Sequence, residues 1–158
     1  MIESKNSWQD SYNRAIQLLA AREHSAQELE TKLLRKGFEH DDVEIAIGML
    51  QEQNLQSDQR FVDVFVRSRS QRGHGPTKIS HELRQKGITA ELIEEAVNAQ
   101  GSHWFDYARQ HYQKKYRNTV VNNYNEWTKR ARFMQNRGYT MEHIKAIVEF
   151  DQKSADYE

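Results

Sequence analysis

The sequence has 158 residues, with 23 basic and 23 acidic side chains and no cysteine. Charged residues make up 29% of the chain against 37% hydrophobic residues, which favours amphipathic helices that share thin cores. The missing cysteines exclude disulfides, thiolate zinc sites and cysteine nucleophiles. No apolar run approaches the roughly 20 residues that span a membrane, and the first residues lack the layout of a signal peptide. We therefore expect a soluble cytoplasmic protein with no membrane partner.

The first third of the chain reads as three helices. The spacing of apolar residues predicts helices at about 8–22, 25–36 and 41–53. Ser25 with Glu28 three residues later forms a capping-box pattern, which satisfies free amide groups at a helix start. Lys36 and Gly37 indicate a helix end, since glycine adopts the left-handed conformation and the cation lies near the carbonyl end of the dipole.

The middle third follows the same pattern. A helix is predicted to begin at Ser57 and Asp58, with a buried face of Phe61, Val62, Phe65 and Val66. Gly75-Pro76 begins the next helix, because proline is tolerated in a first turn where its missing N–H would be unpaired anyway. Ile79 and Leu83 are expected to face the core. Gly87 ends this helix, and Thr89 caps the third.

The last third is predicted to form helices at about 103–116, 124–136 and 140–152, and no alternating run rich in valine or threonine indicates a strand. The strings KGF at 36–38, KGI at 86–88 and RGY at 137–139 recur at offsets of 50 and 51 residues. A period of this size is typical of stacked supersecondary units. We therefore predict an all-α fold, an elongated tandem array of three three-helix repeats at 1–56, 57–102 and 103–152, with a tail at 153–158.

The net charge of the chain is zero, but two segments of the sequence are strongly basic. Residues 57–86 carry 7 basic and 3 acidic side chains, and residues 103–137 carry 8 and 2. The segments before, between and after these blocks are acidic. A field of this kind binds anions locally even on a neutral protein.

The sequence contains no complete motif for phosphate binding, metal binding or catalysis. The string Gly73-His74-Gly75-Pro76 lacks the third glycine and the preceding strand of a dinucleotide fingerprint, so we interpret it as a corner between helices. The seven histidines form no zinc-binding motif, and no nucleophile-elbow pattern occurs. We expect no metal, no cofactor and no enzymatic activity.

The central stretch LQSDQRFVDVFVRSRSQRGHGPTKISHELRQKGI, residues 55–88, resembles the RecX family, the regulators of the RecA recombinase. The resemblance continues in HSAQELETKLLRKG at 24–37 and in RFMQNRGYTMEHI at 132–144. It implies tandem three-helix repeats without catalytic activity. It further implies binding to RecA filaments on single-stranded DNA, with inhibition of recombinase and coprotease functions in recombination, DNA repair and the SOS response.

The basic blocks suit these partners. We expect contacts to DNA or RecA from the cations Arg67, Arg69, Arg72, Lys78, Arg84, Lys86, Lys114, Lys115, Lys129, Arg130 and Arg132. The second block also interleaves tyrosines with cations, an arrangement that can stack bases and neutralise phosphates, although aromatic residues at helical spacing are more often part of a core. Duplex DNA is a further candidate partner, and we expect a monomer.

Two other functions remain open from the residues alone. One is a helical protein of the helix-turn-helix type that acts on duplex DNA without RecA. The other is a protein-interaction scaffold with no nucleic-acid role. Charge distribution does not separate them from a RecA regulator.

Overall fold

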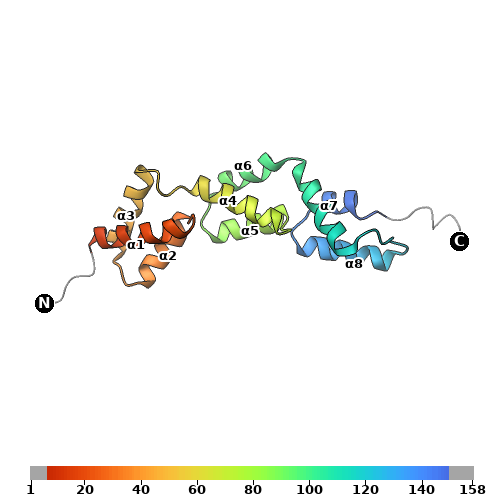
Figure 1. Cartoon of the computed structure of the whole chain (residues 1–158), viewed down its shortest axis with the longest axis horizontal. Coiled ribbons are helices and arrows are strands. Elements are labelled where there is room, and N and C mark those ends of the chain that lie inside the picture. The colour runs from red at the N-terminus through yellow and green to blue at the C-terminus, as the bar shows by residue number, and fades with distance from the viewer. Residues whose placement is uncertain (1–6, 150–158) are drawn as a thin grey trace. The chain divides into compact units, whose positions relative to one another are not determined.

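The computed structural model describes residues 7–149, and within that range it consists of α-helices without a strand (Figure 1). The predicted tail at 153–158 lies outside the described residues. The helices are α1 (Trp8–Ala21), α2 (Ala26–Arg35), α3 (His40–Glu52), α4 (Asp58–Gln71), α5 (Pro76–Gln85), α6 (Ala90–Gln100), α7 (His103–Tyr116), α8 (Tyr124–Asn136) and α9 (Met141–Ile147). The prediction of an all-α protein built from three three-helix repeats is confirmed.

Local signals explain where most helices begin and end. Ser25 accepts from the Glu28 amide while the Glu28 side chain accepts from the Ser25 amide, so the predicted capping box is present. Asn123 caps α8 by accepting from the amide of Glu126. At the other end of α2, Gly37 has a φ of +93°, the left-handed conformation that a side chain disfavours.

The end of α9 differs from its prediction. The helix was expected to continue to residue 152, but Ile147 is its last residue and Val148 leaves helical geometry with φ −91° and ψ 87°. The Val148 side chain is buried, and its carbonyl oxygen accepts a hydrogen bond from Trp127 Nε1. The apolar periodicity alone predicts that the helix continues past Ile147. The structure instead uses the Val148 carbonyl oxygen in a hydrogen bond to another helix.

Each outer repeat has its own small core. The first core gathers side chains of α1, α2 and α3 around Ala15, Leu29, Leu33, Val43, Ile47 and Leu50. The third gathers Ala108, Tyr112, Val121, Ala131, Met134, Tyr139, Ile144, Ile147 and Val148. In the middle repeat, the predicted core residues Phe61, Val62, Phe65, Val66, Ile79 and Leu83 are all buried. The thin, shared cores expected from the composition are present.

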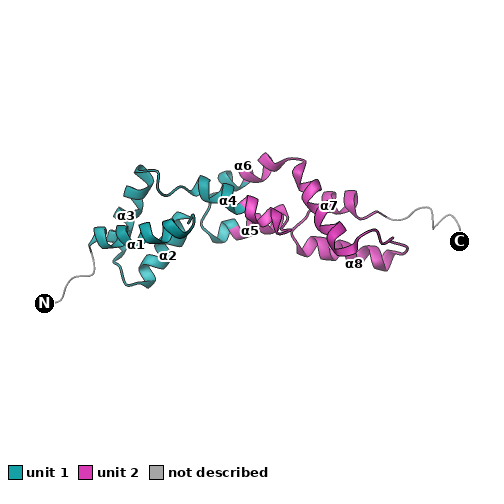
Figure 2. Ribbon diagram, in the orientation of Figure 1, with its two compact units in different colours: residues 1–65, 83–93 teal, residues 66–82, 94–158 magenta. Residues whose placement is uncertain are grey.

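The chain divides into two compact units whose boundary runs through the middle repeat (Figure 2). Unit 1 comprises residues 1–65 and 83–93, and unit 2 comprises residues 66–82 and 94–158. Each unit therefore joins an outer repeat to part of the middle one. The contacts described below all lie inside one unit or the other.

Candidate nucleic-acid interface

In unit 1, the start of α2 contacts the last turn of α5. Ser25 Oγ donates to the carbonyl oxygen of Lys86 at 2.8 Å, and Gln27 Nε2 donates to that of Gln85 at 3.0 Å. A Cβ on Gly87, which has a φ of +78°, would overlap with the Gln27 side chain. We call this contact the first joint. It places a helix N-terminus, rich in donors, against the carbonyl end of another helix.

An ion-pair cluster around the largely buried carboxylate of Glu28 completes the first joint. Glu28 Oε2 lies 3.0 Å from Arg22 Nη2 and 3.1 Å from Lys86 Nζ. Burial opposes ionisation of Glu28, but hydrogen bonds from Arg22, the Ser25 amide and Lys86 outweigh it and lower the pKa of this carboxyl to about 2. Lys86, one of the predicted binding cations, therefore pairs with Glu28 inside the joint.

His24 lies beside this cluster and is buried. Its Nδ1 lies 3.0 Å from the Arg22 carbonyl oxygen, and its Nε2 lies 2.8 Å from Lys32 Nζ. The neutral tautomer that donates through Nδ1 leaves Nε2 free to accept from the ammonium group. Burial lowers the pKa of His24, with the nearby Arg22 and Lys32 charges acting in the same direction.

In unit 2, the corner at Gly75 makes the second joint, with the turn after α8. The Gly75 amide donates to the carbonyl oxygen of Arg137 at 2.7 Å, and the Thr77 amide donates to that of Gly138 at 2.9 Å. A Cβ on Gly75 would overlap with the backbone of Gly138. The string from Gly73 to Pro76 therefore contacts the third repeat through the Gly75 amide and through the absence of a side chain at Gly75.

Histidines and cations surround the second joint. A Cβ on Gly73, with a φ of +92°, would come within 2.9 Å of the His111 ring. Burial lowers the pKa of His74 and of His111, and the charge of Arg137 acts on both in the same direction. His111 lies against the end of α4, and His103 lies beside Asp106.

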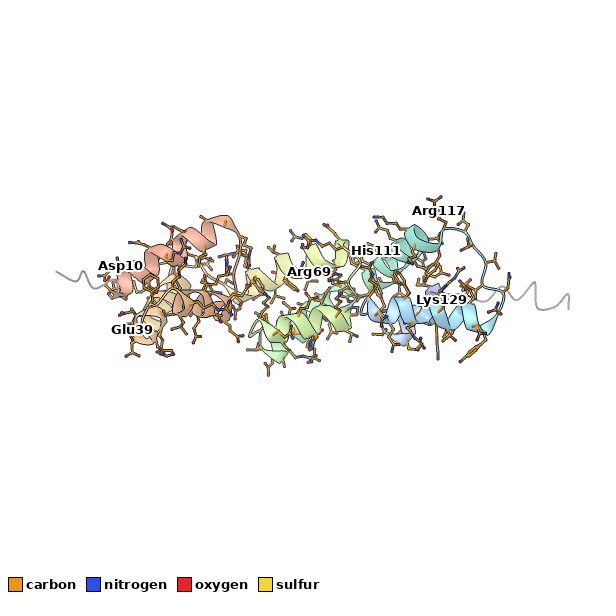
Figure 3. The ribbon with its side chains drawn as sticks, turned by 90° about the horizontal axis from the view of Figure 1, so that it is seen from below. Asp10, Glu39, Arg69, His111, Arg117 and Lys129 are labelled. Atoms are coloured by element: carbon orange, nitrogen blue, oxygen red, sulfur yellow. The ribbon has the colours of Figure 1, made fainter. Side chains whose placement is uncertain are left out.

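The predicted cations divide by exposure. Those with exposed side chains are Arg67, Arg72, Arg84, Lys114, Lys115, Lys129 and Arg132. All but Arg84 belong to unit 2, and Figure 3 shows Lys129 on α8 among them. Lys115 Nζ also lies 4.8 Å from the centre of the Phe133 ring, a cation–π geometry. Unit 2 thus carries most of the basic surface expected from the sequence.

Two further predicted cations, Arg69 and Lys78, are partly buried around the second joint. Arg69 Nε lies 3.3 Å from Glu82 Oε2, and the Lys78 backbone packs against Gly138. The Arg69–Glu82 pair takes part of the positive charge out of the surface. Arg69 and Lys78 therefore contribute to packing within unit 2, and their side chains are less accessible to a ligand than those of the exposed cations.

Arg130, another of the predicted binding cations, is buried in the third repeat. Its side chain is 5% exposed, and its guanidinium donates to Tyr112 Oη, to the carbonyl and Oγ1 of Thr119, and to Glu126 Oε1 at 2.8–3.0 Å. Every nitrogen therefore has a partner within the third repeat. The repeat alignment contains a signal for this burial, because the offsets of 50 and 51 place Arg130 at the position of Leu29 and Ile79, both fully buried.

The structure adds Arg117 and Arg137 to the basic side chains of unit 2. Arg117 ends α7 with φ 52° and ψ −135°, a backbone conformation that is essentially restricted to glycine. Its side chain is exposed and extends away from the ribbon in Figure 3. Arg137 corresponds to Lys36 and Lys86 in the repeat, so the alignment alone could have singled it out.

The aromatic residues of the second block are mainly structural. Trp104 and Tyr112 are buried, and Tyr107 packs against the third core. Tyr124 differs, since its ring is 70% exposed and stacks on Trp127 at an interplanar angle of 14°. It is the aromatic residue in this block best placed to stack on a base.

Models of three RecX domains match successive stretches of the chain. The first three-helix domain of RecX matches residues 12–50, the second 57–97 and the third 105–148. The chain belongs to the RecX family. Regulatory protein RecX of Vibrio parahaemolyticus is 36% identical over 141 residues, covering 89% of this chain and 91% of its own. Regulatory protein RecX of Legionella pneumophila is 37% identical over 137 residues, covering 87% and 91%.

Solved RecX structures share the fold. A crystal structure of regulatory protein RecX superposes with a TM-score of 0.76 at 22% identity, covering 89% of this chain and 70% of its own. RecX from Lactobacillus salivarius gives a TM-score of 0.75 at 21% identity, covering 94% and 96%. Among residues 7–149, no helix of this chain is long and apolar enough to cross a membrane.

One group of metal-ligating side chains occurs among the described residues, away from the histidines considered above. His40, Asp41 and Glu44 bring one ligand atom each within 4.8 Å of one another at the start of α3. All three side chains are exposed, and His40 already lies 3.6 Å from Asp41 and 3.8 Å from Glu30. A solvated helix start with acidic residues accounts for this arrangement.

Proposed function

We propose that the protein binds RecA filaments on single-stranded DNA and inhibits RecA without catalysing a reaction itself. The observation that carries this proposal is membership of the RecX family over nearly the whole chain. Relatives that cover this chain at 36–37% identity are named regulatory protein RecX. RecA is accordingly the partner proposed, with DNA as the second component of the same complex.

The charge of unit 2 supports a DNA contact. Its exposed predicted cations are Arg67, Arg72, Lys114, Lys115, Lys129 and Arg132, and Arg117 adds to them. Exposed cations that displace counterions from phosphates supply most of the affinity of non-specific DNA binding. We retain Arg84 in unit 1 as a candidate contact, and we assign Lys86 and Arg130 structural roles in the first joint and the third core.

A titration of RecA ATP hydrolysis on single-stranded DNA tests the proposal. We expect the wild-type protein to suppress hydrolysis at a substoichiometric ratio to RecA. No suppression at an equimolar ratio would contradict the proposal. The Arg67→Ala/Arg72→Ala variant should require more protein for the same suppression, whereas Lys145→Ala, which removes an exposed cation of α9 outside the proposed set, should behave as the wild type.

A competition experiment separates this proposal from action on duplex DNA alone. Bound protein is challenged with single-stranded and duplex competitors of equal length, with and without RecA. Displacement by one duplex sequence far more readily than by random duplex, in the absence of any effect on RecA, would favour a sequence-reading protein instead.

A further inference from the structure

A groove of about 490 Å³ lies between α2 and α3, two helices of unit 1 (Figure 2). Ala26 and Glu30 line it from α2, and the side chains that line it from α3 include Glu44 and Ile47. These residues are spaced by three or four positions along each helix, so each helix contributes one face. A volume of this size is typical of a site that receives a side chain or a small ligand.

The bottom of the groove is apolar and is left open by two small residues. Val43 and Ile47 are buried beneath it as part of the first core. Ala26 contributes only a methyl group, and a Cβ on Gly48 would have no described atom within 4 Å. The groove therefore has room for a large apolar side chain that the first repeat does not itself supply.

The third repeat supplies such a side chain at the equivalent place. The combined repeat offset of 101 residues pairs Ala26 with Trp127 and Ile47 with Val148. Trp127 packs against the third core, and its Nε1 donates to the carbonyl oxygen of Val148 at 2.9 Å. The indole of Trp127 thus crosses from α8 to the end of α9, over the space that Ala26 leaves open in the first repeat.

The second repeat also brings an indole to this position. Val97 corresponds to Ile47 at the offset of 50, and its carbonyl oxygen accepts from Trp104 Nε1 at 3.0 Å. The remaining tryptophan of the chain, Trp8, makes an edge contact with Tyr12 within α1. The first repeat is therefore the one whose α2–α3 groove has no tryptophan of its own among the described residues.

The rim of the groove determines the charge of its occupant. Glu30 and Glu44 line it, and among the described residues no lysine or arginine does so. The third repeat, whose groove is filled internally, has Ala131 and Lys145 at these two positions. An acidic rim repels phosphate groups and attracts cations, so the occupant is a cationic group and not a nucleic acid.

We propose that the groove between α2 and α3 binds a segment of a partner protein in which a large aromatic side chain lies next to lysine or arginine. The aromatic side chain occupies the space over Ala26 and Gly48, and the neighbouring cations pair with Glu30 and Glu44. Burial of the aromatic side chain supplies most of the affinity, while the exposed ion pairs select the charge of the segment. This peptide site in unit 1 is separate from the DNA contact proposed for unit 2.

A peptide titration tests the proposal on the full chain without RecA or DNA. The blocked tripeptide lysine-tryptophan-lysine is added to ¹⁵N-labelled protein, and backbone amide shifts are followed by NMR. We expect saturable shifts centred on Ala26, Ile47 and Gly48. The peptides lysine-alanine-lysine and glutamate-tryptophan-glutamate should each bind at least about tenfold more weakly, which corresponds to about 1.4 kcal/mol. Equal binding of the three peptides, or shifts centred outside the groove, would overturn the proposal.

Three variants separate the groove from general effects of charge. Gly48→Leu should weaken binding of lysine-tryptophan-lysine at least about tenfold by filling the groove, and its helicity should be retained because leucine is a better helix former than glycine. Glu44→Lys should weaken binding about fivefold by turning an exposed ion pair into a repulsion. Asp63→Lys makes the same charge change at an exposed position of α4 in unit 1, outside the groove lining, and should bind as the wild type. Wild-type affinity in both groove variants would contradict the proposal.

Dilution of the protein alone tests the other occupant, a second copy of the chain. Shifts of the groove amides that change with protein concentration in the absence of peptide would place a second copy there and would overturn the proposal. Constant shifts are the expected result. None of these measurements involves RecA, so their failure would leave the proposed inhibition of RecA untouched.

Discussion

The amide of Gly75 donates a 2.7 Å hydrogen bond to the carbonyl oxygen of Arg137. This bond ties the most glycine-rich part of the sequence to the turn after α8, within unit 2. The amide groups that a phosphate would need are thereby used inside the protein. The string from Gly73 to Pro76 consequently positions the basic residues around it.

We predict that Gly75→Ala lowers the free energy of unfolding by about 1–3 kcal/mol, because the added methyl group would overlap with the Gly138 backbone. Urea denaturation measures the change. Gly48→Ala is the matched control. Gly48 lies inside α3 with no described atom near its missing Cβ, so alanine should raise the stability by about 0.5–1 kcal/mol. A destabilised Gly48→Ala together with an unaffected Gly75→Ala would contradict the described packing.

Arg130→Ala should destabilise the protein by about 3 kcal/mol, since it leaves the buried partners of a charged group unpaired. Arg132→Ala, two residues away and exposed, should change the stability by less than about 0.5 kcal/mol. Chemical denaturation of both variants tests the distinction between a structural and a surface arginine. DNA affinity should show the reverse order for this surface residue, because Arg132→Ala should weaken DNA binding while the fold stays intact.

Glu28 should make the stability depend on acid pH. Its pKa is about 2 in the folded chain against an ordinary value of 4.5, so the unfolded chain binds a proton first as the pH falls. The stabilisation is fully present above about pH 4.5 and is lost toward pH 2, by at most about 3 kcal/mol. Glu28→Gln should be less stable at pH 7 and should show a flatter stability profile between pH 5 and 2. A profile with the wild-type slope would show that this carboxyl does not titrate as described.

The Arg67→Ala/Arg72→Ala variant should bind single-stranded DNA with a weaker salt dependence. If each arginine neutralises one phosphate, the slope of log K against log salt should fall by about 1.4 in magnitude. Fluorescence anisotropy over a salt series measures this slope, with Lys145→Ala as the control for a general loss of charge. An unchanged slope would remove these two arginines from the interface.

Arg117→Gly should separate stability from binding. Glycine adopts the backbone conformation of Arg117 without strain, so the substitution should leave the stability unchanged or raise it by about 1 kcal/mol. The same change removes an exposed cation from unit 2 and should weaken DNA binding. Thermal unfolding and anisotropy on one sample provide both values. Wild-type binding with a clear gain in stability would assign the strained arginine no role in DNA contact.

Helix positions could be predicted from the sequence because their signals are local. The capping box of Ser25 and Glu28 and the glycine after Lys36 lie within a few residues of the ends that they determine. All predicted helix starts agree with the structure to within a residue or so. The late end predicted for α9 failed where the Trp127–Val148 bond, a tertiary contact, takes over.

The candidate site could be predicted only as a set of charges. Composition identifies a basic block, but it does not distinguish an exposed Arg132 from a buried Arg130, because burial depends on which helix face meets the core. The partners of Lys86 and Arg69 come from other helices and are invisible to local spacing. Comparison of equivalent repeat positions recovers part of this information, as the match of Arg130 with Leu29 illustrates.

The second joint is built from backbone amides and carbonyl oxygens, with two glycines at the point of closest approach. Main-chain groups are the same in every residue, so side chains on either side can diverge while the joint keeps its bonding. The first joint differs, because it depends on the side chains of Ser25, Gln27 and Glu28. Substitutions of side chains should therefore disturb the contact inside unit 1 more readily than the contact inside unit 2, where glycine at 75 and 138 is the main requirement.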